Sequence, residues 1–236
     1  MSDPHFGGAT SRPAVAPFVR AVVADPALEF AVVTGDLTAG GFDGKVTCGC
    51  LAPFLGANNA VVGGSRDDQL GAFLDAVVEP VQRAGKAVYL VAGNHDQYNG
   101  AGRHPVDDFI RRAHGDTHYS VVRGGVMLLF CGVYPDEAVR AWLATMLRDN
   151  HMPVVFFFHY NLQGAFSDWW PDSEKEAFRE AIQDKRVLGI FVGHRHETYA
   201  ETWCGYSVYG TAGDNAYAVC EVSADRLRLT VTFTNV

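Results

Sequence analysis

The sequence has no apolar run of membrane-spanning length, no basic stripe and few cysteines. The first absence argues against a transmembrane segment. The sequence also lacks a charged start followed by an apolar stretch, which is the pattern of a secretory leader. We therefore expect a soluble, cytoplasmic protein, or a secreted form if an upstream signal peptide was removed. A net charge of −8 without clustered Lys and Arg argues against extended nucleic acid as a partner.

The five cysteines are odd in number and scattered, which argues against a disulfide framework. Cys131, Cys204 and Cys220 are expected to behave as small hydrophobic residues in strand-like runs. Cys48 and Cys50 are too close for the usual C-x-x-C motif, and we interpret them as two loop cysteines. A local disulfide or redox pair at these two positions stays open.

The 236 residues are 48% hydrophobic, enough to bury one sizeable core, so a single domain over residues 1–236 is expected. Apolar runs that predict strands alternate with stretches of helical spacing, several of which open with Asp or Ser. The expected strands are 30–33, 87–91, 126–131, 154–158 and 187–192, and the expected helices are 13–24, 67–84, 105–113, 136–148 and 173–183. Shorter runs at 206–209, 216–222 and 227–233 indicate an antiparallel C-terminal section. The pattern predicts a layered α/β (α+β) fold.

The segment 38–65 is rich in Gly and Asn and long for a connection inside a domain. A functional loop and a tolerated surface insertion are equally good interpretations of it.

Five short patterns carry side chains suited to metal binding, and four of them follow an expected strand directly. They are Asp3-Pro4-His5, Gly35-Asp36, Gly93-Asn94-His95-Asp96, His159 and Gly193-His194-Arg195-His196. Taken singly, an Asp or a Gly-Asp pair is more often a cap or turn, and one histidine is more often a core residue with a hydrogen-bond partner. Because ligands collect at the carboxyl ends of strands in α/β sheets, the ordered set predicts one shared site.

Asp, Asn and His supply oxygen and nitrogen ligands without a soft thiolate, which suits manganese, iron or zinc. Two such ions about 4 Å apart can hold a hydroxide for in-line attack on phosphorus and offset charge on the phosphoryl oxygens. The residues therefore indicate a phosphoester hydrolase that uses two divalent metal ions.

This ordered set resembles the calcineurin-like metallophosphoesterase family, whose pattern is D-x-H, G-D, G-N-H-D/E, H and G-H-x-H, and the resemblance spans positions 3 to 196. It implies a β-sandwich flanked by helices, with a dinuclear site at the strand ends. It further implies the following ligands: Asp3, His5 and His196 for one metal, Asn94, His159 and His194 for the other, and Asp36 between them. By the same resemblance, His95 assists the leaving oxygen as a catalytic residue, and Asp96 supports the loop or that histidine.

Substrate contacts are expected from residues next to these motifs. Tyr160 and Asn161 follow His159 directly, and an aromatic cluster up to Trp170 is either a substrate wall or a packed loop. Arg195, Arg103 and His104 are phosphate-binding candidates, although an arginine such as Arg195 more often points to solvent.

Two departures from the family pattern stand out. Only two residues precede Asp3, so the first strand is missing or supplied otherwise, which bears on the placement of Asp3 and His5. Ala39 occupies the position where the purple acid phosphatase branch has a tyrosine ligand, so a ferric tyrosinate site is not expected.

The function that the sequence favours is hydrolysis of a small or medium-sized phosphorylated substrate by a phosphatase or phosphodiesterase. The alternative is a catalytically silent scaffold of the same fold. Relatives of that kind typically lack the histidine of G-N-H or several ligands, whereas His95 and every motif ligand are present here. The sequence leaves open the natural substrate, the native metals and the oligomeric state.

Overall fold

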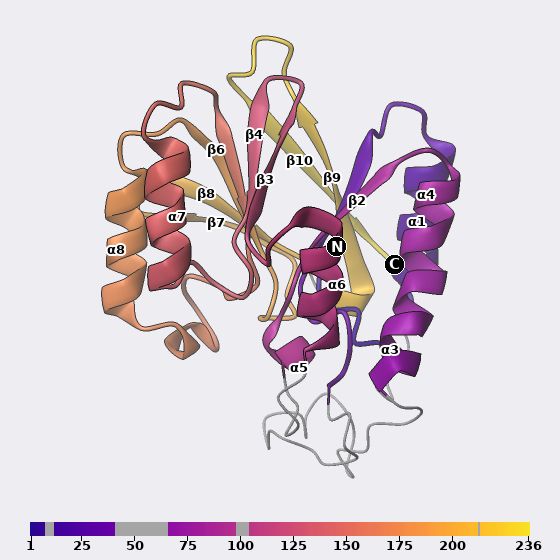
Figure 1. Cartoon of the computed structure of the whole chain (residues 1–236). Coiled ribbons are helices and arrows are strands. Elements are labelled where there is room, and N and C mark those ends of the chain that lie inside the picture. The colour runs from indigo at the N-terminus through magenta and orange to yellow at the C-terminus, as the bar shows by residue number, and fades with distance from the viewer. Residues whose placement is uncertain (8–11, 41–65, 98–103, 212) are drawn as a thin grey trace.

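The computed structural model describes residues 1–7, 12–40, 66–97, 104–211 and 213–236. Two layers of strands lie face to face between two outer layers of helices (Figure 1). The larger layer is a six-stranded sheet in the order β3-β4-β5-β6-β8-β7. Its strands are β3 (Tyr119–Arg123), β4 (Val126–Phe130), β5 (Val154–Phe157), β6 (Val187–Val192), β7 (Tyr199–Trp203) and β8 (Tyr206–Gly210).

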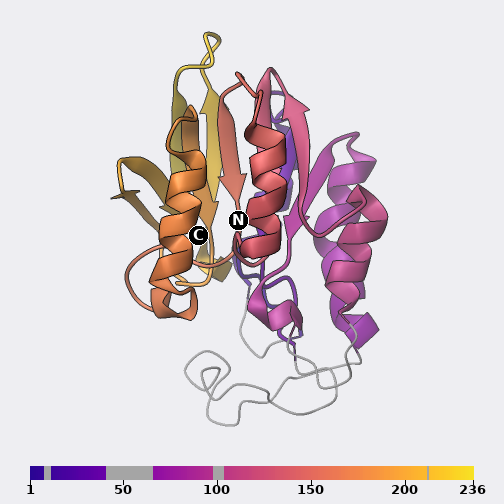
Figure 2. The same cartoon turned by 60° about the vertical axis from the view of Figure 1, so that its left-hand side comes forward.

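Two helices, α7 (Glu137–Leu147) and α8 (Asp172–Ile182), cover the outer face of this sheet (Figure 2). Their buried side chains, among them Leu143 and Phe178, pack with Phe156 and Phe158 around the fully buried Trp170. The Asp136 side chain caps α7 by accepting a hydrogen bond from the Val139 N–H at 2.9 Å, as the sequence predicts.

The second layer consists of two short sheets. Strands β1 (Phe30–Thr34) and β2 (Ala87–Val91) pair in parallel, and β9 (Ala216–Val222) pairs antiparallel with β10 (Leu229–Asn235). The helices on its outer side are α1 (Val15–Ala24), α3 (Arg66–Phe73), the π-helical turn η2 (Leu74–Val78), α4 (Glu79–Arg83) and α6 (Pro105–His114). Short helical turns complete the described elements: α5 (Asn94–Gln97), η3 (Ser167–Trp169) and η4 (Gly213–Asn215).

The predicted fold class is confirmed, and the differences concern single elements. The predicted helix 67–84 contains the π-helical turn η2, which its apolar spacing does not reveal. The predicted antiparallel C-terminal section is present, because β8 pairs antiparallel with β7 and β9 pairs antiparallel with β10. In addition, β8 is parallel to β6, which was not predicted. Strands β3 and β7 were not predicted, because each has exposed positions and lies at a sheet edge.

The cysteines of the described chain are free thiols. Cys131 is buried as expected, whereas Cys204 and Cys220 are exposed, so the expectation of a small core hydrophobe was wrong for those two. Cys48 and Cys50 lie outside the described residues, as does most of the segment 38–65. Among the described helices, none combines the length and the apolar character needed to span a membrane.

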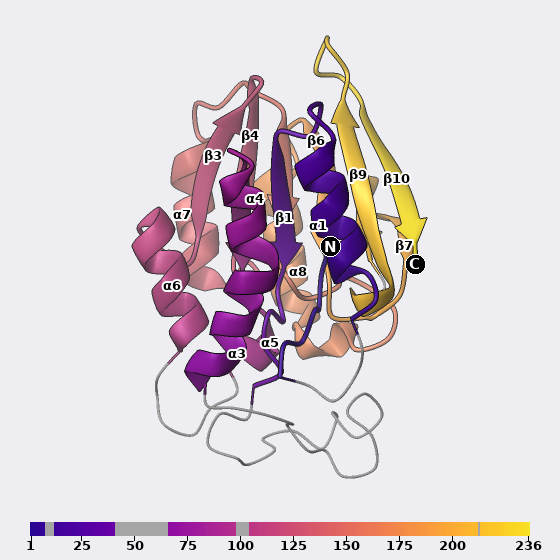
Figure 3. The same ribbon diagram turned by 90° about the vertical axis from the view of Figure 1, so that its right-hand side faces the viewer.

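An apolar cavity of about 440 Å³ lies between β1 and β9, beneath α1 (Figure 3). Its lining from α1 and the six-stranded sheet is largely apolar and includes Phe18, Val22, Leu128 and Phe157.

Candidate metal centre

The motif side chains meet where the central strands end. Asp36 lies just after β1, Asn94 follows β2, His159 follows β5, and His194 follows β6. These strands belong to both layers of the sandwich, so their carboxyl ends bring together loops that lie far apart in the sequence.

Asp3 and His5 are held by backbone hydrogen bonds to the loop that follows β1. The Asp3 N–H donates to the Gly35 carbonyl at 3.0 Å, and the His5 N–H donates to the Asp36 carbonyl at 2.9 Å. One bridge, between Phe6 and Thr38, continues this parallel pairing. The two residues thus reach the site although no strand among the described residues leads into them.

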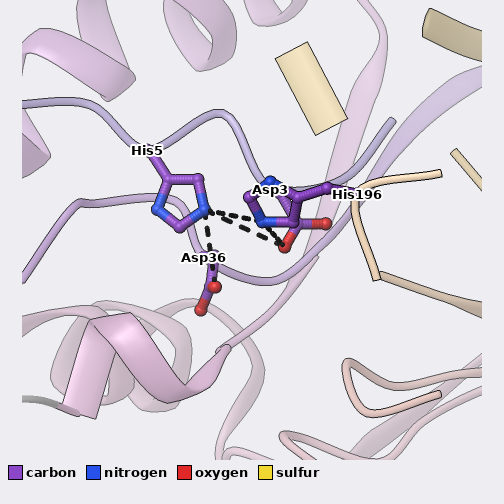
Figure 4. A group of neighbouring side chains, drawn as sticks. All are labelled: Asp3, His5, Asp36 and His196. Carbon is purple, nitrogen blue, oxygen red and sulfur yellow. Dashed lines mark hydrogen bonds and ion pairs between the residues drawn. The ribbon is translucent and has the colours of Figure 1, made fainter. Parts of the chain in front are cut away.

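The first group of candidate ligands contains Asp3, His5, Asp36 and His196, whose ligand atoms lie within 4.8 Å of one another (Figure 4). The Nε2 atom of His196 is 3.3 Å from Asp3 Oδ1, and the Nε2 atom of His5 is 3.6 Å from Asp36 Oδ2. The two Nε2 atoms are 3.2 Å apart. Two carboxylates and two imidazoles therefore converge on one point.

The second group contains Asp36, His159 and His194, again within 4.8 Å of one another. His159 Nε2 is 3.3 Å from Asp36 Oδ2 and 3.0 Å from the Oδ1 atom of the buried Asn94. Asp36 is common to both groups. Its Oδ1 accepts a hydrogen bond from the His95 N–H at 2.8 Å, and its Oδ2 faces both His5 and His159. This is the arrangement of a carboxylate that can bridge two metal ions.

Backbone carbonyls orient two of the imidazoles. His159 Nδ1 lies 2.9 Å from the Thr34 carbonyl, and His95 Nδ1 lies 3.1 Å from the Ala39 carbonyl. A proton on each Nδ1 satisfies these contacts and leaves Nε2 to face the site. In His95 that nitrogen is 3.8 Å from Asp36 Oδ2.

Five of the seven candidate ligands have a backbone in the left-handed region. The φ angles are 50° for Asp3, 42° for His5, 50° for Asp36, 67° for His194 and 54° for His196. Such conformations are uncommon outside glycine and cost of order 1 kcal/mol or more each. Their concentration in one place is typical of a functional site.

Three motif glycines lie against these ligands. A Cβ at Gly93 would lie 2.1 Å from Asp36 Oδ1, one at Gly35 would lie 2.4 Å from His159 Nδ1, and one at Gly193 would lie 2.6 Å from Asp3 Oδ2. Glycine is needed at each position because the ligand occupies the space of a side chain.

Charge interactions shift the pKa values of the cluster in both directions. Burial alone would raise the pKa of Asp3, but the nearby His196 and His159 lower it to about 2, and the pKa of Asp36 is likewise held well below its usual range by His159 and His95. Burial lowers the pKa of His5 and of His194 to about 3. His159 is also buried, yet Asp36 and Asp3 raise its pKa to about 9.

The donor set fits divalent metal ions. It contains buried carboxylates and imidazoles, groups that bind metals as the carboxylate and as the neutral ring. The Nε2 atom of His194 is buried and has no hydrogen-bond partner among the described residues, although it belongs to the second group. A nitrogen with this environment gains a partner when a metal ion binds.

Asp96 fastens the loops that carry Asp36 and His95. Its carboxylate accepts hydrogen bonds from the backbone N–H groups of Leu37 (3.1 Å), Thr38 (2.8 Å) and Gly93 (2.8 Å), and from the Thr38 hydroxyl (2.8 Å). Burial and the negative charge of Asp36 raise the pKa of Asp96 to about 7, although these hydrogen-bond donors act to lower it.

Several predicted substrate residues have other partners. The fully buried Asn161 donates from its amide to the carbonyls of Gln163 and Ala165, both at 2.8 Å, so it holds its own loop. Arg195 pairs with Glu197 and Glu201, and its guanidinium lies over the Tyr199 ring. Both side chains therefore have protein partners, and their contact with a substrate stays a prediction.

Of the remaining predicted substrate residues, one lies beside the candidate metal centre and two do not contribute to its described part. Tyr160 lies beside the second group, with its ring centroid 4.7 Å from that of His194. His104 is the residue before α6 and belongs to neither group. Arg103 lies outside the described residues.

Three supporting residues were not predicted from the sequence. The Ser2 hydroxyl donates to Asp3 Oδ2 and lies 3.3 Å from the Thr211 hydroxyl. Arg12 donates to the Pro4 and His5 carbonyls, both at 2.5 Å. Ser2 could have been predicted from its position next to the first motif, whereas no local sequence pattern points to Thr211 or Arg12.

The model of the calcineurin-like phosphoesterase family matches residues 1–198. A dimetal phosphatase from Danio rerio has a similar structure, with a TM-score of 0.58 and 16% identity over 93% of this chain and 87% of the other. The protein TT1561 of Thermus thermophilus has a TM-score of 0.58 and 13% identity over 98% and 96%. At these identities the two structures show the fold. No curated protein matches the sequence.

Proposed function

The chain belongs to the calcineurin-like phosphoesterase family, and from this premise we propose that it hydrolyses phosphate esters of small or medium size with two divalent metal ions. The observation that carries the proposal is the position of Asp36. One carboxylate serves two groups of ligands, with Asp3, His5 and the half-buried His196 on one side and the buried His159 and His194 on the other. We add Asn94 to the second group, because its Oδ1 lies 3.0 Å from His159 Nε2.

The ligand chemistry limits the choice of metal. Imidazole and carboxylate donors suit manganese, iron and zinc, and the described cluster contains no thiolate. When bound, two such ions would activate water and offset negative charge on a phosphoryl group. The protein contributes a rigid set of donors, because the loops that carry them are fixed by backbone contacts.

We assign to His95 the role of proton donor to the leaving oxygen. It is buried beside the cluster, and its Nδ1 has the Ala39 carbonyl as a fixed partner. The protonated ring would keep that contact through Nδ1 and present its second proton from Nε2. An imidazole suits this task because its ordinary pKa lies near neutrality.

We further propose that the organic part of the substrate contacts Tyr160 and two aromatic residues of the same loop. Trp169 and the exposed Phe166 lie near His194, with centroid distances of 4.8 Å and 6.0 Å. Phe166 has a left-handed backbone with a φ of 63°, a strained conformation for an aromatic residue. Trp170, by contrast, is part of the core.

The test is hydrolysis of p-nitrophenyl phosphate and of its bis ester in manganese, zinc and iron. We expect activity from the unmodified chain, a loss of at least about a hundredfold in kcat for His95→Ala with metal content retained, and loss of both activity and metal for Asp36→Asn. His151→Ala and Asp149→Asn are matched controls, because both residues are exposed.

Equal rates for the unmodified chain, His95→Ala and Asp36→Asn would refute the proposal. Stoichiometric metal binding without hydrolysis of any ester in a broad panel would instead favour the silent scaffold.

A further inference from the structure

The arginine between the two histidines of the last motif is held by contacts with β7 and with the residues that lead into it. Arg195 Nε lies 2.6 Å from Glu197 Oε2, and its Nη1 lies 3.4 Å from Oε2 of Glu201 on β7. Its guanidinium also lies over the Tyr199 ring, with Cζ 4.7 Å from the ring centroid. A planar guanidinium can pair with carboxylates and stack on a ring at the same time, whereas the point charge of a lysine cannot. Arg195 is therefore tied to the edge strand of the large sheet.

The same guanidinium packs against the loop that follows His159. A Cβ at Gly164 would lie 2.6 Å from Arg195 Nη1 and 2.9 Å from its Cζ, and Gly164 has a φ of 86°. Both the contact and the backbone conformation require glycine at this position. A second contact joins the loop to β7, because the Gln163 amide donates to the Thr202 carbonyl at 3.2 Å. The loop is thus fastened to the edge of the sheet through Arg195 and Gln163.

The residues that follow Gly164 carry aromatic side chains that lie beside the second ligand group. Phe166 and Trp169 have ring centroids 6.0 Å and 4.8 Å from that of His194. Together with Tyr160, which is 4.7 Å from the same histidine, they form an aromatic wall. Phe166 is exposed and has a left-handed backbone. Such strain persists only where the surroundings hold it, and the fixed turn at Gly164 lies two residues before Phe166.

We propose that Arg195 is a positioning residue: through Gly164 it holds the aromatic wall against His194, and it thereby sets the affinity for esters with an aromatic group. This role rests on the proposed function, since the wall adjoins the site at which the phosphoryl group would bind. Glu197 and Glu201 offset the charge of the guanidinium, so the side chain acts through the loop and not by contact with phosphate.

Three variants separate the plane of the guanidinium from its charge. Arg195→Lys keeps the charge but loses the plane, and Arg195→Met keeps a long side chain but loses the charge. Gly164→Ala disturbs the same contact from the loop and leaves the motif histidines and their neighbours unchanged. Arg179→Lys and Arg179→Met are matched controls, because Arg179 pairs with Glu176 within the outer helix α8. For each variant, KM and kcat are measured with p-nitrophenyl phosphate and with glycerol 2-phosphate in manganese.

The expected result is a change in KM that depends on the ester. In all three variants KM for p-nitrophenyl phosphate should rise about threefold to tenfold, the range of one aromatic contact, while kcat stays within about twofold. KM for glycerol 2-phosphate and the affinity for manganese should not change, whereas a merely structural role would alter both esters together. The amides of Ser167 and Trp169, which donate to carbonyls of this loop, should exchange with solvent faster. The Arg179 controls should match the unmodified chain.

An equal rise in KM for both esters would show contact with the phosphoryl group and overturn the proposal, as would unchanged kinetics in Arg195→Lys. If either Arg195 variant loses manganese affinity, Gly164→Ala decides alone. If the unmodified chain hydrolyses neither ester, the proposed function fails, and calorimetric binding of phenylphosphonate and methylphosphonate to the manganese-loaded chain tests Arg195 separately. A loss of affinity confined to phenylphosphonate supports the role. An equal loss for the two compounds, no loss, or no binding of phenylphosphonate by the unmodified chain overturns it.

Discussion

Replacing Gly93 by alanine tests the close packing on which the candidate metal centre depends. The new Cβ would lie 2.1 Å from Asp36 Oδ1 and 2.3 Å from the Asp36 backbone nitrogen, far inside van der Waals contact. Relief requires Asp36 or Gly93 to move. Either movement disturbs the 2.8 Å hydrogen bond from Gly93 N–H to Asp96 and the one from His95 N–H to Asp36.

The size of the effect follows from these contacts. Overpacking in a dense core costs about 1–3 kcal/mol, and weakening one hydrogen bond to a charged group costs about 1.5–3 kcal/mol. We therefore expect a loss of about 3 kcal/mol, which lowers the melting temperature by about 6–12 °C in a domain of this size. Because Asp36 shifts, metal affinity should also fall by about 10- to 100-fold.

The assays are thermal unfolding with and without manganese, and metal titration by calorimetry. Gly71→Ala is the matched control: its Cβ would meet nothing within 4 Å, and its place in α3 predicts a gain of about 0.5–1 kcal/mol from helix propensity. If Gly93→Ala has the same melting temperature and the same metal affinity as the unmodified chain, the close approach of Gly93 to Asp36 is wrong.

Three further predictions concern the supports of the site and its electrostatics. Asp96→Ala leaves three backbone N–H groups without their acceptor and should cost at least about 3 kcal/mol in urea unfolding; an unchanged midpoint would contradict its role as a fastener. Asp136→Ala removes the cap of α7 and should cost about 1 kcal/mol while metal affinity and activity stay unchanged, so any loss of metal binding would count against it. In the metal-free protein, the pKa values of His5 and His194 are about 3, below the ordinary 6.5, so between these values the unfolded chain holds two more protons at these sites. The pKa of Asp96 is raised to about 7, so the folded chain holds one more proton at this site and offsets one of those two. The urea midpoint, measured in the presence of a chelator, should therefore fall as the pH drops from about 6.5 to 4. A midpoint that stays constant over this range would contradict the prediction.

Two of the strands that were predicted correctly, β2 and β6, are covered on both faces for most of their length. Residues 87–91 and 187–192 form near-continuous apolar runs and become β2 and β6 at the predicted boundaries. Strand β7 mixes exposed and half-buried positions, and it is held by its pairing with β8, a feature of the tertiary structure that its own sequence does not encode. The same holds for η2, because the apolar spacing of a helix continues through a π-helical turn.

The sequence identified the candidate metal ligands because each is a side chain in a short motif. It could not identify the groups that aim them. The Thr34 and Ala39 carbonyls, which orient His159 and His95, are backbone atoms and depend on the path of the chain rather than on residue type. Thr211 supports Asp3 through Ser2 across 209 positions, so no local pattern connects them.

The strained backbone of the ligand loops and the repulsion between their carboxylates both destabilise the folded site, and metal binding would offset both. Five left-handed ligand residues together cost about 5 kcal/mol or more, and the buried Asp3 and Asp36 add electrostatic repulsion, since their carboxylates face the same point. Metal ions would relieve the repulsion and bind all five strained residues at once. Binding free energy of this kind contributes directly to folding. The loops are thus expected to be least stable when the metal is removed, and the backbone hydrogen bonds that fasten Asp3, His5 and Asp36 to one another keep the donors in place between binding events.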